Sequence, residues 1–329
     1  MKETILSGMR PTGTLHIGHL SVLNNWVSLQ AEYKCYFFAA DYHALTTGYE
    51  NTADLQENIK NMVIDWMAVG IDPEKSTLFV QSKVQAHAEI FLLLSMLTPL
   101  SWLERCPTYK AQIEQFKVNQ GKDITTYGFL GYPVLQAGDI LLYNANRVPV
   151  GKDQLPHVEM TREIARRFNH IYNKKIFVEP EGKLSEIPLI VGTDGRKMSK
   201  SYHNQINIMS DEKELNKKVR SMITDPSRIH KTDPGNPDVC TVFNYQKIYN
   251  APIIEKLESN CRKGTIGCMD CKKKLISALD ILLSPFREKR AEILKKPSYV
   301  EDVLREGQIQ ASKQADETLN AVKSVMNMA

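Results

Sequence analysis

The chain of 329 residues lacks a strong charge of either sign, because 42 Lys and Arg stand against 38 Asp and Glu. A net charge of +4 is too small to indicate a nucleic-acid partner by itself. Basic residues do cluster locally, at 162–167 and 262–274. The first residues lack the apolar run of a signal peptide, and no segment approaches the length of a membrane span. We therefore expect a cytoplasmic protein with no membrane partner.

Cysteines are also few. Six of them in a chain expected in a reducing compartment do not suggest a disulfide framework. No G-x-G-x-x-G motif occurs, so a dinucleotide site is not indicated. No internal repeat or low-complexity segment is visible either. With 42% hydrophobic residues, the chain is long enough for one large or two modest domains with a real core.

What the sequence does contain is an alternation of apolar, β-prone runs with segments of helical spacing. The β-prone runs lie at 3–6, 35–40, 77–81, 147–150 and 187–191. The helical segments lie at 20–31, 54–69, 86–97, 132–143 and 151–169. This order predicts an α/β fold with a Rossmann-like, doubly wound parallel sheet. Asp41 to His43 follow the second run at its carboxyl end, where such sheets place ligands, although loop residues that cap a strand would look the same.

Beyond residue 201 only helix-like segments remain, separated by Pro, Gly and Asp clusters. They lie at 211–222, 241–256, 272–283 and 299–328. This change of character predicts a smaller, all-helical C-terminal domain.

The turn after the first β-prone run carries the first chemical signal. Gly8 and Gly13 resemble half of a phosphate-binding loop, but Thr14 stands where that motif needs lysine. His16 and His19 are three apart and therefore share one face of the first helical turn. A helix N-terminus attracts phosphate, and two imidazoles there would add hydrogen-bond donors. Alone, however, a His-x-x-His pair is more often two surface histidines.

A second motif far downstream favours a functional role for the two histidines. Lys197-Met-Ser-Lys-Ser201 could by itself be a solvated loop, but together with His16-Ile-Gly-His19 it resembles the paired signature of the class I aminoacyl-tRNA synthetases. The resemblance implies that an amino-acid carboxylate attacks the α-phosphate of ATP and that the aminoacyl group then passes to tRNA. It implies that Mg²⁺ accompanies the ATP phosphates. It also implies a catalytic role for His16, His19, Lys197 and Lys200.

The segment 132–143 carries a polar stripe on an apolar helix. Tyr132, Gln136 and Asp139 fall at i, i+4 and i+7, so that one face carries all three. A carboxylate among apolar neighbours needs a partner if it is buried. On the sequence alone, the partner of Asp139 could be a structural arginine or the N–H of a ligand.

The next segment narrows the resemblance. Val148-Pro-Val-Gly-Lys-Asp-Gln154, followed by His157-x-Glu-x-Thr-Arg162, is similar to the bacterial tryptophanyl-tRNA synthetase family, whose substrates are L-tryptophan and tRNA(Trp). Lys152 departs from the pattern, because family members commonly carry Glu at this position, near which the ATP ribose is bound. The tryptophan-binding residues implied by the resemblance are Gly8, Tyr132, Gln136, Asp139, Val148, Val150 and Gln154. The implied ATP-binding residues are Arg10, Pro11, Thr12, Gly18, His19, Gly151, Lys152, Asp153, Lys197, Met198, Ser199, Lys200 and Ser201.

The resemblance also implies a domain plan. Residues 1–190 would form the catalytic domain, with a short insertion at about 100–131 that resembles the dimer interfaces of the family. Residues 191–300 would carry the lysine loop and a helical anticodon-binding domain. Residues 301–329 would form a C-terminal helix able to pack back on the catalytic domain. We therefore expect a homodimer.

Four of the six cysteines crowd into 32 residues. Cys240, Cys261, Cys268 and Cys271 have the spacing C-x20-C-x6-C-x2-C, and their thiolates could hold either Zn²⁺ or an iron–sulfur cluster. Some tryptophanyl-tRNA synthetases carry a [4Fe–4S] cluster on a similar pattern whose first gap is two residues longer. The resemblance therefore favours a [4Fe–4S] cluster with a structural role near the anticodon, with Zn²⁺ as the alternative.

Three other functions compete with this interpretation. A tyrosyl-tRNA synthetase shares both motifs but must satisfy a phenolic hydroxyl. A small-molecule nucleotidyltransferase can share His-x-Gly-His, yet it does not need a helical tRNA-binding domain. A non-catalytic RNA-binding relative would not need both signatures intact.

Overall fold

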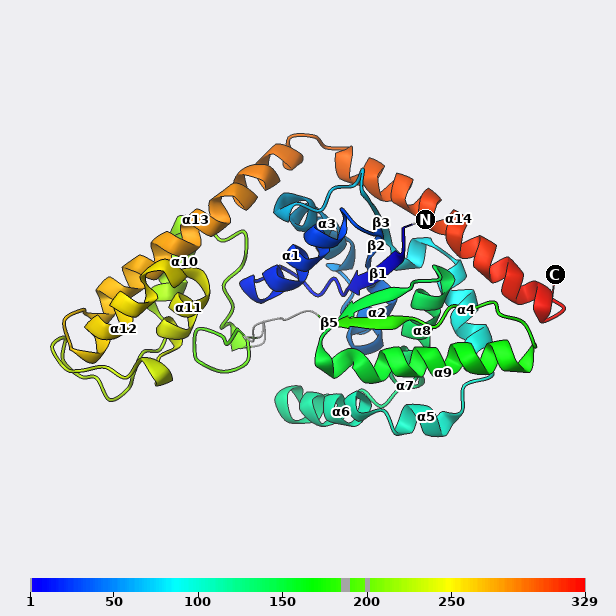
Figure 1. The fold of residues 1–329 in the computed structure, drawn as a ribbon, viewed down its shortest axis with the longest axis horizontal. Helices are drawn as coiled ribbons and strands as arrows, with labels where there is room; N and C mark the ends of the chain where they lie inside the picture. Colours follow the sequence, from blue (N-terminus) through cyan, green and yellow to red (C-terminus); the bar gives the residue numbers. More distant parts are fainter. Residues whose placement is uncertain (1, 185–189, 199–201, 329) are drawn as a thin grey trace. The chain divides into compact units, whose positions relative to one another are not determined.

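The computed structural model describes residues 2–184, 190–198 and 202–328 (Figure 1). The chain forms two compact units. The first contains Met1–Gly13, Asn24–Ile187 and Lys296–Ala329, and the second contains Thr14–Leu23 and Pro188–Lys295. The segment with His16 and His19 therefore belongs to the same unit as the helical region, although the sequence suggested that it would belong to the sheet domain.

The first unit is built on a five-stranded sheet in which every neighbouring pair is parallel. The strand order is β3-β2-β1-β4-β5, so the sheet extends to both sides of β1 and confirms the predicted doubly wound α/β fold. The strands are β1 (Thr4–Met9), β2 (Lys34–Ala39), β3 (Ser76–Val80), β4 (Arg147–Val150) and β5 (Glu181–Leu184).

Helices accompany this sheet in the first unit, and several of them contribute apolar side chains to its core. They are α2 (Asp41–Gly48), α3 (Leu55–Val69), α4 (Ala86–Ser95), α5 (Leu100–Glu104), α6 (Pro107–Gln120), α7 (Tyr127–Leu130), α8 (Tyr132–Leu142), α9 (Leu155–Ile171) and α14 (Tyr299–Val325), with 3-10 turns η2 (Gln81–Lys83) and η3 (Lys152–Gln154). Helix α8 is buried almost throughout, which fits its run of apolar residues.

The fifth strand differs from the one that the sequence predicted. Residues 187–189 of the predicted apolar run at 187–191 lie outside the described residues. Of the two that are described, Val191 forms an isolated antiparallel bridge with Lys197. Instead, β5 pairs with β4 in the register Arg147↔Glu181, and the side chains of these two residues form an ion pair. Because β5 has only one apolar residue, Leu184, its order comes from pairing with β4 rather than from burial.

Helix α14 covers the other edge of the sheet, along β3 (Figure 1). The two backbones approach so closely that a Cβ atom on Gly307 would lie 1.8 Å from the carbonyl oxygen of Leu78. The hydroxyl of Thr77 bonds to Gln310 on the helix at 3.1 Å. A glycine at this point thus lets a helix cap an edge strand that would otherwise expose unpaired backbone groups.

The second unit is helical apart from short bridges. Its elements are η1 (Ile17–His19) with the start of α1 (Leu20–Leu29), α10 (Glu212–Arg220), η5 (Pro237–Val239), α11 (Thr241–Tyr249), η6 (Ala251–Ile253), α12 (Ile254–Arg262) and α13 (Cys268–Leu294). The single helix predicted at 241–256 is wrong, because the chain breaks at Asn250 before Pro252. The helix predicted at 272–283 is longer, and Pro285 lies within it.

Among the described residues, no helix combines the length and the apolar character that crossing a membrane requires.

Candidate active site

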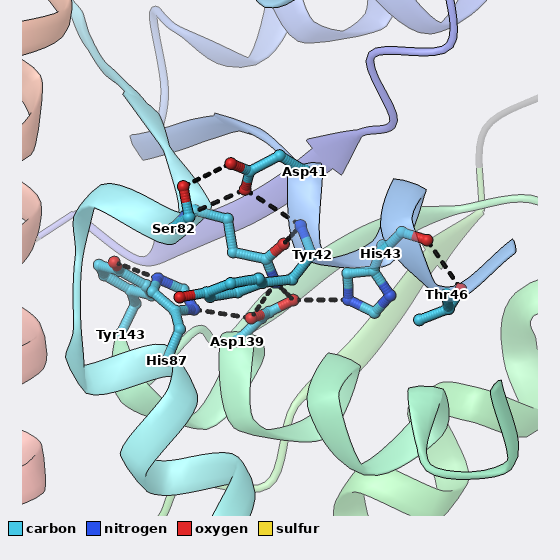
Figure 2. Close-up of polar contacts among 9 residues, drawn as sticks. Asp41, Tyr42, His43, Thr46, Ser82, His87, Asp139 and Tyr143 are labelled. Atoms are coloured by element: carbon cyan, nitrogen blue, oxygen red, sulfur yellow. Dashed lines mark hydrogen bonds and ion pairs between the residues drawn. The ribbon is translucent and has the colours of Figure 1, made fainter. Parts of the chain in front are cut away.

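The carboxylate of Asp139 lies at the centre of a buried hydrogen-bond network in the first unit (Figure 2). His87 on α4 donates from Nδ1 to Oδ1 at 2.6 Å, and His43 on α2 donates from Nε2 to Oδ2 at 2.9 Å. Gln81, in η2, places Nε2 2.8 Å from Oδ1 and 2.9 Å from Oδ2. The partners of Asp139 are thus two imidazoles and an amide, and not the arginine that the sequence left open.

These contacts keep Asp139 charged despite its burial. Burial by itself would raise the pKa of this carboxyl group, but the hydrogen bonds and the charges of His43 and His87 outweigh it, so the pKa is lowered from its usual value. The residue is only 2% exposed. The site therefore offers an ionised acceptor in an apolar setting, which suits recognition of a ligand N–H or O–H.

Further hydrogen bonds hold the network in place. The hydroxyl of Tyr143 lies 2.9 Å from Nε2 of His87, and burial raises the pKa of that tyrosine. Beside them, the buried carboxylate of Asp41 accepts hydrogen bonds from the backbone N–H groups of Tyr42 and Ser82, both at 3.0 Å, and from the Ser82 hydroxyl. The start of α2 is thereby tied to the turn after β3.

The sequence interpretation missed Gln81 and His87 as members of this site. Gln81 directly follows β3, just as Asp41 follows β2. The rule that pointed to Asp41 and His43, polar residues at the carboxyl end of a parallel strand, applies equally to Gln81. His87 has no such local signal, because its side chain reaches Asp139 from within α4.

A second polar chain links three of the predicted residues. The hydroxyl of Tyr132 lies 2.9 Å from Nε2 of His157, Nδ1 of His157 lies 3.0 Å from Oε1 of Gln154, and Nε2 of Gln154 donates to Asp153 at 2.9 Å. Burial lowers the pKa of His157 to about 4. His157 is therefore a neutral link at pH 7 between Tyr132 on α8 and the η3 turn.

The other residues predicted for the tryptophan site lie on β1, β4 and α8. Val148 and Val150 are buried on β4, and Gln136 is half-buried on α8. Gly8 stands opposite Phe38 in the β1–β2 register, and a Cβ on it would lie 2.5 Å from that ring. Gly8 thus makes room for the Phe38 ring.

Residues predicted for ATP flank β1 and β4 in this unit. Arg10, Pro11 and Thr12 follow β1 in a turn in which the N–H of Thr12 bonds to the carbonyl of Arg10 at 2.9 Å. Gly151 precedes η3, where Lys152 and Asp153 are exposed.

The first signature motif and the described start of the second, Lys197 and Met198, belong to the same second unit. His16 forms an antiparallel bridge with Asn207, and the N–H of Ile17 bonds to the carbonyl of Ile206 at 2.9 Å. The rings of His16 and His19 lie 3.9 Å apart, which confirms that the two histidines share a face. A Cβ on Gly18 would lie 2.9 Å from the His16 ring and 3.8 Å from Sδ of Met198, so glycine is needed there.

The segment before the lysine loop is shaped by local hydrogen bonds. Asp194 accepts a bond from Nε of Arg196 at 2.7 Å, and the Arg196 guanidinium lies 4.4 Å from the centre of the Tyr202 ring. The carbonyl of Lys197 accepts the amide of Asn204 at 3.1 Å. Ser199, Lys200 and Ser201 lie outside the described residues.

The four clustered cysteines also lie in the second unit, and all are free thiols. Arg228 places Nη1 4.0 Å from Sγ of Cys261 and 3.8 Å from Sγ of Cys268, and Gln246 approaches Sγ of Cys271 at 3.6 Å. Burial, together with the smaller effect of the neighbouring thiols of Cys240, Cys261 and Cys268, raises the pKa of Cys271 to about 11. Within the described residues, however, no three His, Cys, Asp or Glu side chains meet in an arrangement that could hold a metal ion.

Known proteins are similar to this chain over nearly its whole length. Residues 2–284 match the family "tRNA synthetases class I (W and Y)". A tryptophan–tRNA ligase of Thermotoga maritima is 50% identical over 98% of this chain and 99% of its own, and one of Aquifex aeolicus is 43% identical over 98% and 99%. A crystal structure of tryptophanyl-tRNA synthetase from Campylobacter jejuni, complexed with ADP and tryptophan, superposes with a TM-score of 0.87 at 34% identity, over 98% of this chain and 99% of that chain.

Proposed function

Since the chain belongs to the class I tRNA synthetases for tryptophan and tyrosine, we propose that it ligates L-tryptophan to tRNA(Trp) through a tryptophanyl-adenylate. The observation that carries the proposal is the 50% identity, over nearly the full length of both chains, with a tryptophan–tRNA ligase. The tyrosyl rival finds less support, because tyrosyl-tRNA synthetase structures are similar at only 17–21% identity, which speaks for the fold alone.

The reaction needs charge stabilisation and positioning rather than a protein nucleophile. We assign His16 and His19 to the ATP phosphates and Lys197 and Lys200 to the departing pyrophosphate, with Mg²⁺ carried on the ATP. The adjacent histidine rings at a helix start support the first assignment, because helix N-termini attract phosphate. The remaining ATP contacts fall to the segments 10–12, 151–153 and 198–201.

For the amino acid, Asp139 is the proposed acceptor of the indole N–H, and its ionised, buried carboxylate supports this role. Tyr132, Gln136 and Gln154 would hold the polar end of tryptophan. Gly8, Val148 and Val150 would line the ring.

The test is ATP–pyrophosphate exchange with each of the twenty amino acids. Exchange should require tryptophan, and charging should require tRNA(Trp). Exchange driven by tyrosine would favour the tyrosyl rival, and nucleotidyl transfer without any amino acid would favour the small-molecule rival. Absence of exchange together with tRNA binding would mark a non-catalytic relative.

We further propose that Cys240, Cys261, Cys268 and Cys271 hold a [4Fe–4S] cluster, with Zn²⁺ as the alternative, although their described side chains do not meet in a metal-holding arrangement without it. Soft thiolates suit either centre, and the N–H groups of Arg228 and Gln246 that face the sulfur atoms would offset the negative charge. Bound there, the centre would stabilise the helical region proposed to meet the anticodon. Anaerobic purification with analysis of iron, sulfide and zinc tests this: one zinc per chain rules out the cluster, and no metal rules out the site.

We also propose that the protein works in the cytoplasm as a homodimer. Large apolar side chains are exposed around the insertion, which supports its use as an interface. They are Leu92, Met96, Leu100, Val118 and Tyr127.

A further inference from the structure

The carboxylate of Asp139 has no spare acceptor position in this structure. Oδ1 receives hydrogen bonds from His87 and Gln81, and Oδ2 receives them from His43 and Gln81. A carboxylate offers about four lone-pair positions in all. A ligand N–H that bonds to Asp139 must therefore take over one of these four contacts.

Two of these donors are anchored at their far ends. His87 is fully buried, and its second ring nitrogen lies 2.9 Å from the buried hydroxyl of Tyr143. Gln81 is also fully buried, and its Oε1 accepts the backbone N–H of Tyr42 at 3.1 Å. Displacing either side chain would break a second buried hydrogen bond as well, which adds to the cost of exchange.

His43 is held less firmly. Its side chain is 13% exposed, and within the described residues its ring forms one hydrogen bond, to Oδ2 of Asp139. The backbone of the same residue is fixed separately, because its carbonyl accepts the Thr46 hydroxyl at 2.8 Å. Figure 2 shows the His43 ring approaching Asp139 from the side opposite to His87. Rotation of this ring frees Oδ2 without disturbing the helix or the other two donors.

We propose that His43 is an exchangeable partner of Asp139: the indole N–H of tryptophan takes its place on Oδ2, while Gln81 and His87 stay and fix the carboxylate. The inference rests on the proposed function, which makes Asp139 the indole acceptor. Without substrate, His43 satisfies the buried oxygen. With substrate, a ligand displaces His43 without loss only if it brings its own N–H to the same oxygen, because an unpaired buried acceptor is costly. His43 is thereby a specificity-determining residue.

The direct test follows the histidine ring N–H signals by NMR in protein labelled with ¹⁵N-histidine, with His43→Phe and His87→Phe variants to assign them. Saturation with L-tryptophan should abolish the signal of His43 Nε2–H and leave that of His87 Nδ1–H. The probe L-3-(3-benzothienyl)alanine carries sulfur in place of the indole N–H. It should bind about tenfold or more weakly than tryptophan, since it loses one charge-assisted hydrogen bond.

Binding affinities give an independent readout. His43→Phe keeps an aromatic ring but has no donor to displace, so tryptophan should bind about three- to tenfold more tightly. The matched variant His87→Phe removes an anchored donor and should weaken binding by at least about tenfold. Persistence of the His43 signal at saturation, or no gain in affinity in His43→Phe, overturns the exchange.

Failure of the underlying assignment looks different. If the wild-type protein binds tryptophan and its benzothienyl analogue equally well, or binds neither, Asp139 is not the indole acceptor. In that case the assignment of Asp139 as the indole acceptor and the proposed displacement of His43 are both wrong. If tryptophan binds more tightly than the analogue but the His43 signal persists, only the proposed displacement of His43 is wrong.

Discussion

The proposed tryptophan site depends most on Asp139. If it accepts the indole N–H, Asp139→Asn should weaken tryptophan binding by about 1.5–3 kcal/mol, the contribution of a hydrogen bond to a charged group. ATP binding should stay nearly unchanged. Equilibrium titration of each ligand measures both effects.

The matched control is Asp41→Asn. Asp41 is another buried carboxylate, 3% exposed, and it accepts hydrogen bonds from Tyr42 and Ser82. This change should lower thermal stability with a much smaller effect on tryptophan affinity. If Asp139→Asn behaves in the same way, Asp139 is a structural member of the network and not a substrate ligand.

His157 predicts a pH dependence of stability. Its pKa is lowered from 6.5 to about 4 by burial, so between these values the unfolded chain binds the proton more readily than the folded one. Stability is therefore full above about pH 6.5 and falls as the pH drops toward 4, by at most about 3 kcal/mol in total. Urea unfolding from pH 4 to 7 should show a shallower slope for His157→Gln than for the wild type. Parallel slopes would mean that the ring is accessible to protons in the folded state.

At the scale of elements, the lysine loop should act on the transition state. Lys197→Ala or Lys200→Ala should reduce adenylate formation by about 10²-fold, or roughly 3 kcal/mol, because the charge that these lysines meet develops only during the reaction. Tryptophan affinity should not change. Pyrophosphate exchange measures adenylate formation, and equilibrium binding measures tryptophan affinity. The control is Lys213→Ala, which changes an exposed lysine on α10. Equal losses in binding and turnover would contradict the role.

The contact between α14 and β3 gives a second prediction at this scale. Gly307→Ala puts a methyl group 1.8 Å from the Leu78 carbonyl oxygen, so the helix must shift away from the strand. We expect a loss of about 1–3 kcal/mol from overpacking, despite the better helix propensity of alanine. Urea unfolding measures it, with the exposed α14 variant Asn320→Ala as control. Equal stability of the two variants would show that the helix adapts freely.

The elements that were predicted correctly are those whose own residues are apolar and buried in the fold. Cys35 to Ala39 are all buried, and an uninterrupted apolar run of this kind marks β2 plainly. Strand β5 escaped prediction because it is ordered by β4, with which Glu181 pairs through the backbone and through the side chain of Arg147. A local pattern cannot record a partner that is distant in the chain.

The same limit applies to the site. Asp139 was predictable because a carboxylate stands out on an apolar helix. Its donors were not predictable as a set, because His43, Gln81 and His87 come from three separate elements that meet only in the fold. The two signature motifs, by contrast, were readable because each is contiguous.

At the scale of the whole molecule, light scattering at micromolar concentration should give twice the chain mass of 37.4 kDa. The expectation rests on the exposed apolar side chains of the insertion, among them Val118 at 76% and Tyr127 at 72%, which a closed symmetric pair would cover. Val118→Asp should shift the mass toward the monomer. A monomeric mass for the wild type would exclude the dimer.

The position of α14 has a consequence for synthesis of the protein on the ribosome. Thr77 on β3 and Gln310 on α14 are 233 residues apart in sequence, so the sheet's β3 edge stays open while most of the remaining chain is translated. An open strand edge in a nascent chain is a template for pairing with other chains. Ribosome-bound chains that stop before Tyr299 should therefore depend on chaperones more than full-length chains do, and stop codons late in the gene should yield aggregates rather than shortened enzymes.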